Sequence, residues 1–171
     1  MELWDLYTAD RQPTGRTMHR GEPRPEGCYN LSVSVWIRNA EGKYLISQRA
    51  ANKNTYPLWW ETVGGGVLAG ETTRQAAVRE VFEEVGITVE PDKLRPVFSQ
   101  VGVVWDGVHY REIMDVYLYE MPGEYDAANA RSEEVAQSLW LTRDEIRQYL
   151  EAGRLIETLD YFFDKIDTEG S

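Results

Sequence analysis

Three glutamates, Glu80, Glu83 and Glu84, are the side chains whose type and spacing best suit chemistry. If this segment is a helix with 100° per residue, the three lie within an arc of about 100° on one face. Clustered carboxylate oxygens are the ligands that hard divalent cations such as Mg²⁺ prefer. The spacing therefore predicts a metal site, and the neighbouring elements must present that helix face to a ligand.

The alternative interpretation is an ordinary exposed acidic face, and two features argue against it. Glu83 and Glu84 fall in the last turn of the expected helix, where the helix dipole disfavours each anion by roughly 0.3–1 kcal/mol. Glu80 and Glu84 are also four residues apart, so their like charges repel. A helix built only for stability would carry Lys or Arg there. A bound divalent cation would reverse both penalties.

The bounds of this helix are well marked in the sequence. Thr72 and Gln75 have the spacing of a capping box, and Gly86 is placed to end the helix in a left-handed conformation. We therefore expect a helix over residues 72–86. The apolar stripe expected to face the core consists of Val78, Val81, Phe82 and Val85.

A run of three glycines, Gly64 to Gly66, stands just before this helix. We expect it to join a strand over residues 59–63 to a loop over residues 67–70. Because glycine has no Cβ, the backbone can approach a ligand closely there and offer its carbonyl oxygens. A glycine cluster alone is typical of turns, but beside three carboxylates it supports a binding site.

The rest of the chain predicts a mixed α/β domain with helices covering a sheet. Residues 31–37 alternate between apolar and other side chains, which is typical of a strand. Thr142 and Glu145 form a second capping box, so a helix should start there and end near Gly153. The further expected strands cover residues 3–7, 43–49, 58–63, 96–105, 112–121 and 137–141, and a last helical stripe covers residues 154–166.

Composition excludes several classes of protein. The net charge of −11 argues against a surface that holds long nucleic acid. The longest uncharged run, residues 27–37, has eleven residues, whereas a membrane span needs about 20. The acidic N-terminus does not resemble a secretory signal. Cys28 is the sole cysteine, so no intrachain disulfide can form and we expect a reducing, cytoplasmic setting.

Residues 65–87, GGVLAGETTRQAAVREVFEEVGI, resemble the Nudix box, G-x5-E-x7-R-E-U-x-E-E-x-G-U, in which U is an aliphatic residue. All nine fixed positions match. The order of the surrounding strands is also similar to a Nudix domain over about residues 29–150. The resemblance implies an α/β/α sandwich with a mixed sheet, forming one domain over residues 1–171. Residues 1–28 would be an N-terminal hairpin extension and residues 154–171 a C-terminal helix.

The resemblance also implies Mg²⁺-dependent hydrolysis of a diphosphate linked to a nucleoside or a similar organic group, with Mn²⁺ as a substitute metal. The metal is expected to bind the side chains of Glu80, Glu83 and Glu84 and the carbonyl oxygen of Gly65. Arg79 would orient a neighbouring glutamate, and Glu71 would support the packing of loop on helix by pairing with Arg79. The partner is a small diphosphate; homodimers are common in such proteins, and the substrate stays open.

A general base often lies outside the Nudix box. We rank Glu112, at the head of a strand, slightly ahead of Glu134, which with Glu133 lies on a loop before the strand over residues 137–141. The alternative for each of these glutamates is that it is an ordinary surface acid. Arg49 is expected to meet either a phosphate or a box glutamate.

Two other functions compete with hydrolysis. The surrounding sequence also resembles isopentenyl diphosphate isomerase, a Nudix-fold relative that places a catalytic cysteine just after the tryptophan-containing strand. Glycines hold that place here, and Cys28 lies before the first core strand. The other alternative is a non-catalytic nucleotide-binding module; such modules tend to lose box glutamates, and this chain keeps them.

Overall fold

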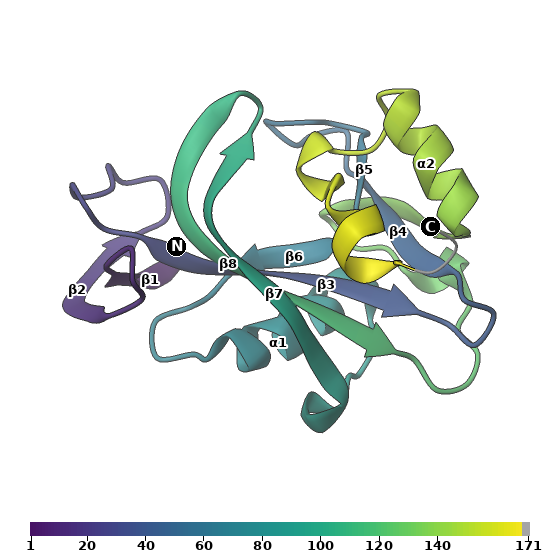
Figure 1. The fold of residues 1–171 in the computed structure, drawn as a ribbon, viewed down its shortest axis with the longest axis horizontal. Helices are drawn as coiled ribbons and strands as arrows, with labels where there is room; N and C mark the ends of the chain where they lie inside the picture. The colour runs from purple at the N-terminus through teal and green to yellow at the C-terminus, as the bar shows by residue number, and fades with distance from the viewer. Residues whose placement is uncertain (169–171) are drawn as a thin grey trace.

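The computed structural model describes residues 1–168, which fold around a mixed β-sheet (Figure 1). Its strands run in the order β5-β4-β3-β8-β7, with β6 also pairing with β3 and β9 with β4. The strands are β3 (Asn30–Arg38), β4 (Tyr44–Arg49), β5 (Trp60–Glu61), β6 (Val63–Gly66), β7 (Leu94–Trp105), β8 (Val108–Glu120) and β9 (Val135–Leu141). The helical elements are α1 (Thr73–Val85), α2 (Arg143–Glu151) and the short turns η1 (Pro91–Lys93), η2 (Ala127–Asn129), η3 (Glu157–Leu159) and η4 (Phe162–Ile166).

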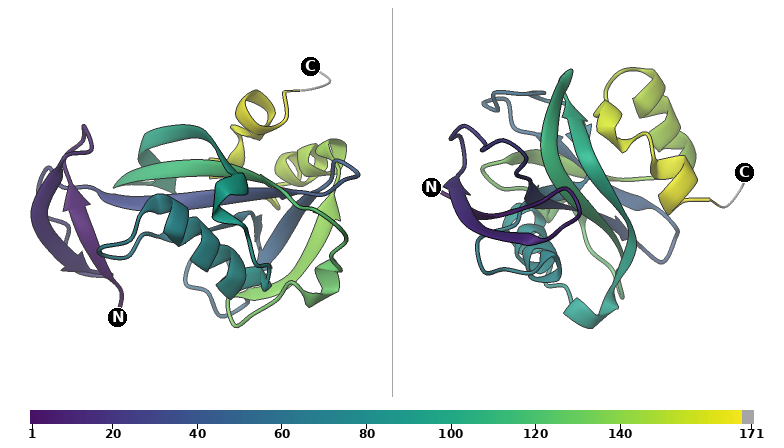
Figure 2. Two further views of the ribbon diagram at one scale, coloured as in Figure 1. Left: turned by 90° about the horizontal axis from the view of Figure 1, so that it is seen from below. Right: turned by 60° about the vertical axis from the view of Figure 1, so that its left-hand side comes forward.

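Both faces of the sheet are covered (Figure 2, left). On one face, Leu31, Val33 and Val35 of β3 pack with Ala76, Ala77, Val81 and Val85 of α1. On the other face, a second cluster joins the sheet to α2 and the C-terminal turns; it includes Trp36, Ile46, Ile146 and Phe162. The expected sandwich of helices around a mixed sheet is therefore present, and the alternation in β3 sends its serines to the second face.

The sheet splits beside β3. β3 pairs with β4 only at Arg38 and Tyr44, and with β6 from Ser32 to Val35. A cavity of about 830 Å³ lies where the strands part, and its wall includes residues of β3, β4, β6 and α1. This volume is in the range of ordinary small-molecule sites.

Helix α1 has the predicted caps but a different buried face. Thr72 accepts from the Gln75 backbone and Gln75 closes the capping box, while Gly86 adopts φ 73°. Val81 and Val85 are buried as expected, but Phe82 is 59% exposed. The buried face consists of Thr73, Ala76, Ala77, Glu80, Val81 and Val85, so α1 is rotated to bring Glu80 against β6.

The three glycines form a strand, which corrects the prediction that they lead from a strand into a loop. β6 runs antiparallel to β3, pairing Gly66 with Ser32 and Gly65 with Val33. Each glycine is needed for close approach, because a Cβ on Gly64 would lie 2.6 Å from the carbonyl oxygen of Val33, and one on Gly65 would collide with the Glu80 carboxylate. The space that a side chain at Gly65 would fill is therefore occupied by the Glu80 carboxylate.

Residues 1–28 form the expected N-terminal hairpin. β1 (Leu3–Tyr7) and β2 (Pro13–His19) pair antiparallel and stand at one end of the sheet (Figure 2, left). Trp4, Leu6, Met18 and Cys28 make a small core of their own. Backbone hydrogen bonds of 2.8 and 2.7 Å between Tyr7 and Tyr29 tie the hairpin to the start of β3.

The C-terminal helix expected over residues 154–171 is wrong where the structure describes it. Residues 157–159 form a 3-10 turn and residues 162–166 a π turn. Leu155 makes a β-bridge to Trp60, and the Ile156 backbone N–H donates to the Trp60 carbonyl at 3.0 Å, so this segment is extended before the turns begin. Residues 169–171 lie outside the described residues.

Candidate functional site

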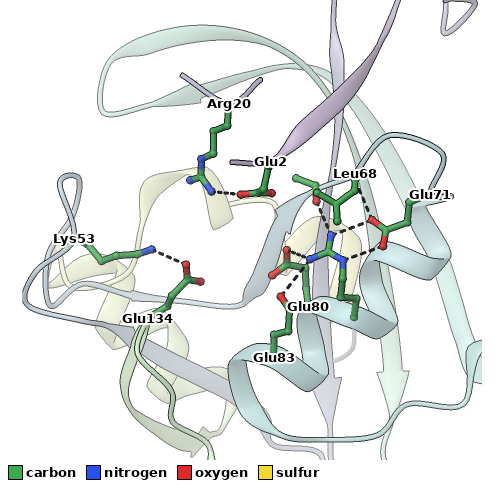
Figure 3. Close-up of polar contacts among 10 residues, drawn as sticks. Glu2, Arg20, Lys53, Leu68, Glu71, Glu80, Glu83 and Glu134 are labelled. Atoms are coloured by element: carbon green, nitrogen blue, oxygen red, sulfur yellow. Dashed lines mark hydrogen bonds and ion pairs between the residues drawn. The ribbon is translucent and has the colours of Figure 1, made fainter. Parts of the chain in front are cut away.

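A network around Arg79 organises the base of the site (Figure 3). The Arg79 guanidinium donates to both oxygens of Glu71, at 2.9 and 3.0 Å, and to the Gly66 carbonyl at 2.9 Å. It also donates to Glu80 at 2.8 Å and to Glu83 at 3.3 Å. The predicted Arg79–Glu71 pair is therefore present. Because Arg79 contacts β6, the preceding loop and two box glutamates, it fixes the position of the helix against the strand.

Glu80 and Glu84 lie deepest among the acidic residues of α1. Glu80 is 7% exposed and lies over Gly65, where no side chain competes for the space. Burial raises the pKa of Glu80, Arg79 opposes this change, and the nearby charges of Glu83 and Glu134 add to it.

Glu84 differs from its neighbours because no Lys or Arg forms an ion pair with it within residues 1–168. Burial raises its pKa well above the ordinary value, and the carboxylates of Glu61, Glu80 and Glu134 raise it further. Glu84 thus shares one cavity wall with three other carboxylates, and unlike them it has no cation of its own in residues 1–168.

This donor set fits a hard divalent cation, which binds carboxylate and carbonyl oxygens. In the described part of the chain, no three acidic, histidine or cysteine side chains already converge as a finished metal site. Arg79 holds one oxygen each of Glu80 and Glu83. The Glu83 side chain is 57% exposed and would have to turn to share a cation with Glu84.

Glu112 lies in the same cavity but not beside the box glutamates. β8 runs parallel to β3, with Ile113 opposite Leu31 in the core under α1. The neighbouring residue Glu112 therefore points to the opposite face of the sheet. Burial raises the pKa of Glu112, while the Ser32 hydroxyl, Arg24 and Arg20 oppose this change.

The structure instead brings Glu134 and Glu61 towards the box. Glu134 lies 3.5 Å from Lys53, and its charge raises the pKa of Glu61, Glu80 and Glu84. Its neighbour Glu133 is exposed. Glu61 was not among the residues predicted from the sequence; the available signal was a charged residue between Trp60 and Thr62 in an expected strand, three residues before the glycines.

Arg49 pairs with Glu61 at 2.6 Å, so its partner is a glutamate outside the box. Its guanidinium also lies over the Trp105 ring, 5.1 Å from the centroid. Arg49, Lys53 and Trp105 all line the cavity, which gives this wall two cations and an aromatic face opposite the acidic helix.

Comparison with known proteins agrees with this geometry. The NUDIX domain model matches residues 29–162. The chain belongs to the Nudix family. It is 34% identical to an uncharacterized Nudix hydrolase of Listeria monocytogenes over 165 residues, covering 95% of this chain and 91% of that protein. The Nudix match begins where the sequence analysis placed it and extends beyond residue 150 to 162.

Two further relatives bear on the Nudix assignment. An isopentenyl-diphosphate Delta-isomerase of Corynebacterium diphtheriae is 31% identical over 148 residues, which cover 82% of this chain and 79% of that protein. A crystal structure from Deinococcus radiodurans has a TM-score of 0.70 at 23% identity, covering 91% and 92% of the two chains, and shows the shared fold. Among the helices of residues 1–168, none has the length and apolar character needed to cross a membrane.

Proposed function

We propose that this Nudix protein is a Mg²⁺-dependent hydrolase that cleaves a diphosphate bond in a nucleoside diphosphate-linked or similar organic compound. The observation that carries the proposal is Glu84, a half-buried carboxylate with no Lys or Arg partner in residues 1–168, which lines the same cavity as Glu61, Glu80 and Glu134. The name of the Listeria relative, a Nudix hydrolase, supports the same reaction class.

In this proposal Glu80, Glu83, Glu84 and the Gly65 carbonyl hold the metal. When bound, Mg²⁺ supplies charge neutralisation for the diphosphate and lowers the pKa of a bound water. Arg79 orients Glu80 and Glu83 while Glu71 holds Arg79 in place. Arg49 and Lys53 are placed on the opposite wall to receive phosphate oxygens.

The general base is proposed to be Glu134 in preference to Glu112. Glu134 is close enough to the box carboxylates to influence their ionisation, whereas the electrostatic neighbours of Glu112 are Ser32, Arg24 and Arg20. Glu134→Gln should lower kcat more than it raises KM. If Glu112→Gln produces that loss and Glu134→Gln does not, the sequence-based ranking with Glu112 first is right and the preference for Glu134 is wrong.

The test of the reaction is cleavage of a panel of organic diphosphates, with Mg²⁺ and with EDTA, in which chromatography detects release of the phosphomonoester, pyrophosphate or phosphate products. The panel contains nucleoside di- and triphosphates, sugar nucleotides, dinucleotides, coenzyme A and isoprenoid diphosphates. We expect metal-dependent release from at least one compound and its loss in Glu84→Gln. Release that is independent of metal, or none from any compound, would refute the proposal.

Isomerase activity is the second candidate, because one relative is an isopentenyl-diphosphate Delta-isomerase. Moving a proton on carbon needs an acid–base pair near the alkene. Cys28 is 4% exposed and packs in the hairpin core with Trp4, Leu6 and Met18. We therefore expect Cys28→Ala to retain diphosphate hydrolysis, and the wild type not to interconvert isopentenyl and dimethylallyl diphosphates. Chromatography of each isomer after incubation decides between the two.

A further inference from the structure

A polar recess at the hairpin end of the cavity has no part in the proposed metal chemistry. We call it the hairpin recess and define it by Trp4, Arg24, Ser32 and Glu112, all of which line the cavity. Trp4 and Arg24 precede residue 29 and so come from outside the matched Nudix domain. The recess is thus built by this chain's own N-terminal extension against β3 and β8.

The indole of Trp4 is the clearest sign of a ligand. Trp4 is 8% exposed, and its Nε1–H has no acceptor in the described structure. A Cβ on Gly66 would lie 2.8 Å from that nitrogen, so the N–H lies directly over Gly66. Because Gly66 pairs with Ser32, the Trp4 N–H and the Ser32 hydroxyl are on the same face of the sheet. A buried donor without a partner is costly unless a ligand satisfies it.

Arg24 and Ser32 offer further unused hydrogen bonds. One Arg24 nitrogen donates to Asn30 Oδ1 at 2.5 Å, which anchors the guanidinium, but its Nε–H has no acceptor within residues 1–168. Ser32, 8% exposed, makes no hydrogen bond of good geometry, although its hydroxyl faces Glu112 closely enough to favour the charged carboxylate. The recess therefore holds donors and a carboxylate acceptor side by side.

The charges of the recess favour a neutral ligand group. Arg20 is paired with Glu2 at 2.7 Å, and the charge of Arg24 is opposed by Glu112. Glu22 also lines this end of the cavity and adds a negative charge. An anion would meet at least as much negative as positive charge here, so a second phosphate is disfavoured. The matching ligand is a neutral group that both accepts and donates hydrogen bonds.

The position of the recess selects which part of a substrate enters it. Trp4 fills the space over Gly66 on the face of β6 opposite Glu80, and the recess opens into the same cavity as the box glutamates. A substrate whose diphosphate lies at those glutamates can therefore place a neighbouring group in the recess. In a nucleotide the sugar is that neighbour, whereas the base lies farther away. Sugar hydroxyls can accept from the Trp4 N–H and donate to the Glu112 carboxylate.

We propose that the hairpin recess binds the hydroxyls of a ribose-type sugar next to the diphosphate, with Trp4 and Glu112 as specificity-determining residues. The proposal rests on the proposed hydrolase function for its substrate class. In this proposal the N-terminal hairpin contributes to substrate specificity, whereas the reaction takes place at α1 and its neighbours.

The test measures binding of nucleoside monophosphates, which contain no diphosphate bond to cleave, in Mg²⁺ by calorimetry. AMP, CMP, GMP and UMP are each compared with their 2′-deoxy and 3′-deoxy counterparts. We expect at least one ribose compound to bind about 10-fold more tightly than a deoxy counterpart, the effect of one good hydrogen bond to a charged group. Trp4→Phe, which keeps the ring but removes the N–H, and Glu112→Gln should each reduce this ratio to about 3 or less.

Trp59→Phe is the matched control, because Trp59 packs against Tyr56 outside the cavity lining and its replacement should leave the ratio unchanged. Equal affinity for ribose and deoxyribose compounds in the wild type overturns the proposal. The proposal is also overturned if Trp4→Phe and Glu112→Gln both keep the wild-type ratio, or if they lose preference among the bases instead of this ratio. It is overturned too if no monophosphate binds. Hydrolysis of another organic diphosphate would then leave the proposed reaction standing. Ribose selectivity without hydrolysis would support the recess and refute the reaction.

Discussion

Asp115 and Glu84 are two carboxylates of the same molecule in opposite electrostatic settings. Asp115, on β8, is 9% exposed and receives hydrogen bonds from both terminal nitrogens of Arg11, at 2.7 and 2.6 Å. The hydroxyls of Thr73 and Ser99 add two more at 2.7 Å. Burial alone would raise the pKa of Asp115, but these partners outweigh it and the pKa is lowered.

Glu84 receives no comparable help from the fold. Its neighbours are other carboxylates, and its pKa is raised by burial and by their charge. The protein thus neutralises the carboxylate that joins its hairpin to its core, and leaves unneutralised the one on the helix with the Nudix pattern. The difference suggests a structural role for the first and a ligand-binding role for the second.

The largest effect is expected from Glu84→Gln on turnover. Removing this charge should lower kcat by roughly 100-fold or more, the range for loss of one electrostatic or acid–base group at a reaction centre. The melting temperature should stay the same or rise, because the change also removes repulsion with Glu61 and Glu80. Glu83→Gln should show the same loss of turnover. Exposed Glu151→Gln is the control, and wild-type turnover in both site variants would refute the site.

Asp115→Asn should show the opposite pattern, a loss of stability rather than a loss of turnover. It removes the charge paired with Arg11 and replaces one of the two acceptor oxygens by an NH₂ group, so the free energy of unfolding should fall by about 2–3 kcal/mol. The expected value is at the lower end because the Arg11 side chain is 40% exposed. Urea unfolding measures the change, with exposed Asp160→Asn as the control. A stable Asp115→Asn protein with lost turnover would show that Asp115 belongs to the reaction and would remove the contrast.

Magnesium should stabilise the wild type and Asp115→Asn but not Glu84→Gln. At ten times its dissociation constant, a metal that binds only the native state adds about 1.4 kcal/mol, or roughly 3–5 °C in melting temperature for a chain of this size. Differential scanning fluorimetry with and without Mg²⁺ measures this shift. An equal shift in Glu84→Gln would place the metal elsewhere.

The smallest effect concerns pH in metal-free protein, where the two carboxylates act with opposite signs. Asp115 has a lowered pKa in the folded state, so its stabilisation is present above about pH 3.9 and is lost as the pH falls towards the lowered value. Glu84 has a raised pKa, so the folded state binds more protons and stability declines as the pH rises above about 4.3. Unfolding curves from pH 3 to 8 should show a shallower decline in Glu84→Gln, because Glu61 and Glu80 also have raised pKa values, and an unchanged decline in Asp115→Asn.

Local patterns in the sequence were sufficient for much of the fold. The caps of α1 and α2 and the strand alternation in β3 depend on neighbouring residues, and the structure contains each of them. The C-terminal segment was predicted wrongly because its apolar spacing suits a helix, while the bridge between Leu155 and Trp60 depends on a strand almost a hundred residues earlier.

The candidate site shows the same division. The Arg79–Glu71 pair follows from the Nudix pattern, and it is present. The place of Glu112 depends on the register of β8 against β3, which sends its side chain to the face opposite α1. The presence of Glu61 and Glu134 in the same cavity as Glu84 depends on the pairing of both β5 and β9 with β4. No local pattern contains that information.

The contact between Arg11 and Asp115 also has a consequence for opening motions. Arg11 lies at the tip of the N-terminal hairpin, and Thr73, which shares the same carboxylate, is the first residue of α1. Separating the hairpin from the sheet therefore removes the cation that holds the carboxylate to which the start of the helix is bonded. The two segments should exchange their amide hydrogens with deuterium as one cooperative unit, so that the wall of the recess and the helix that carries the glutamates become accessible together.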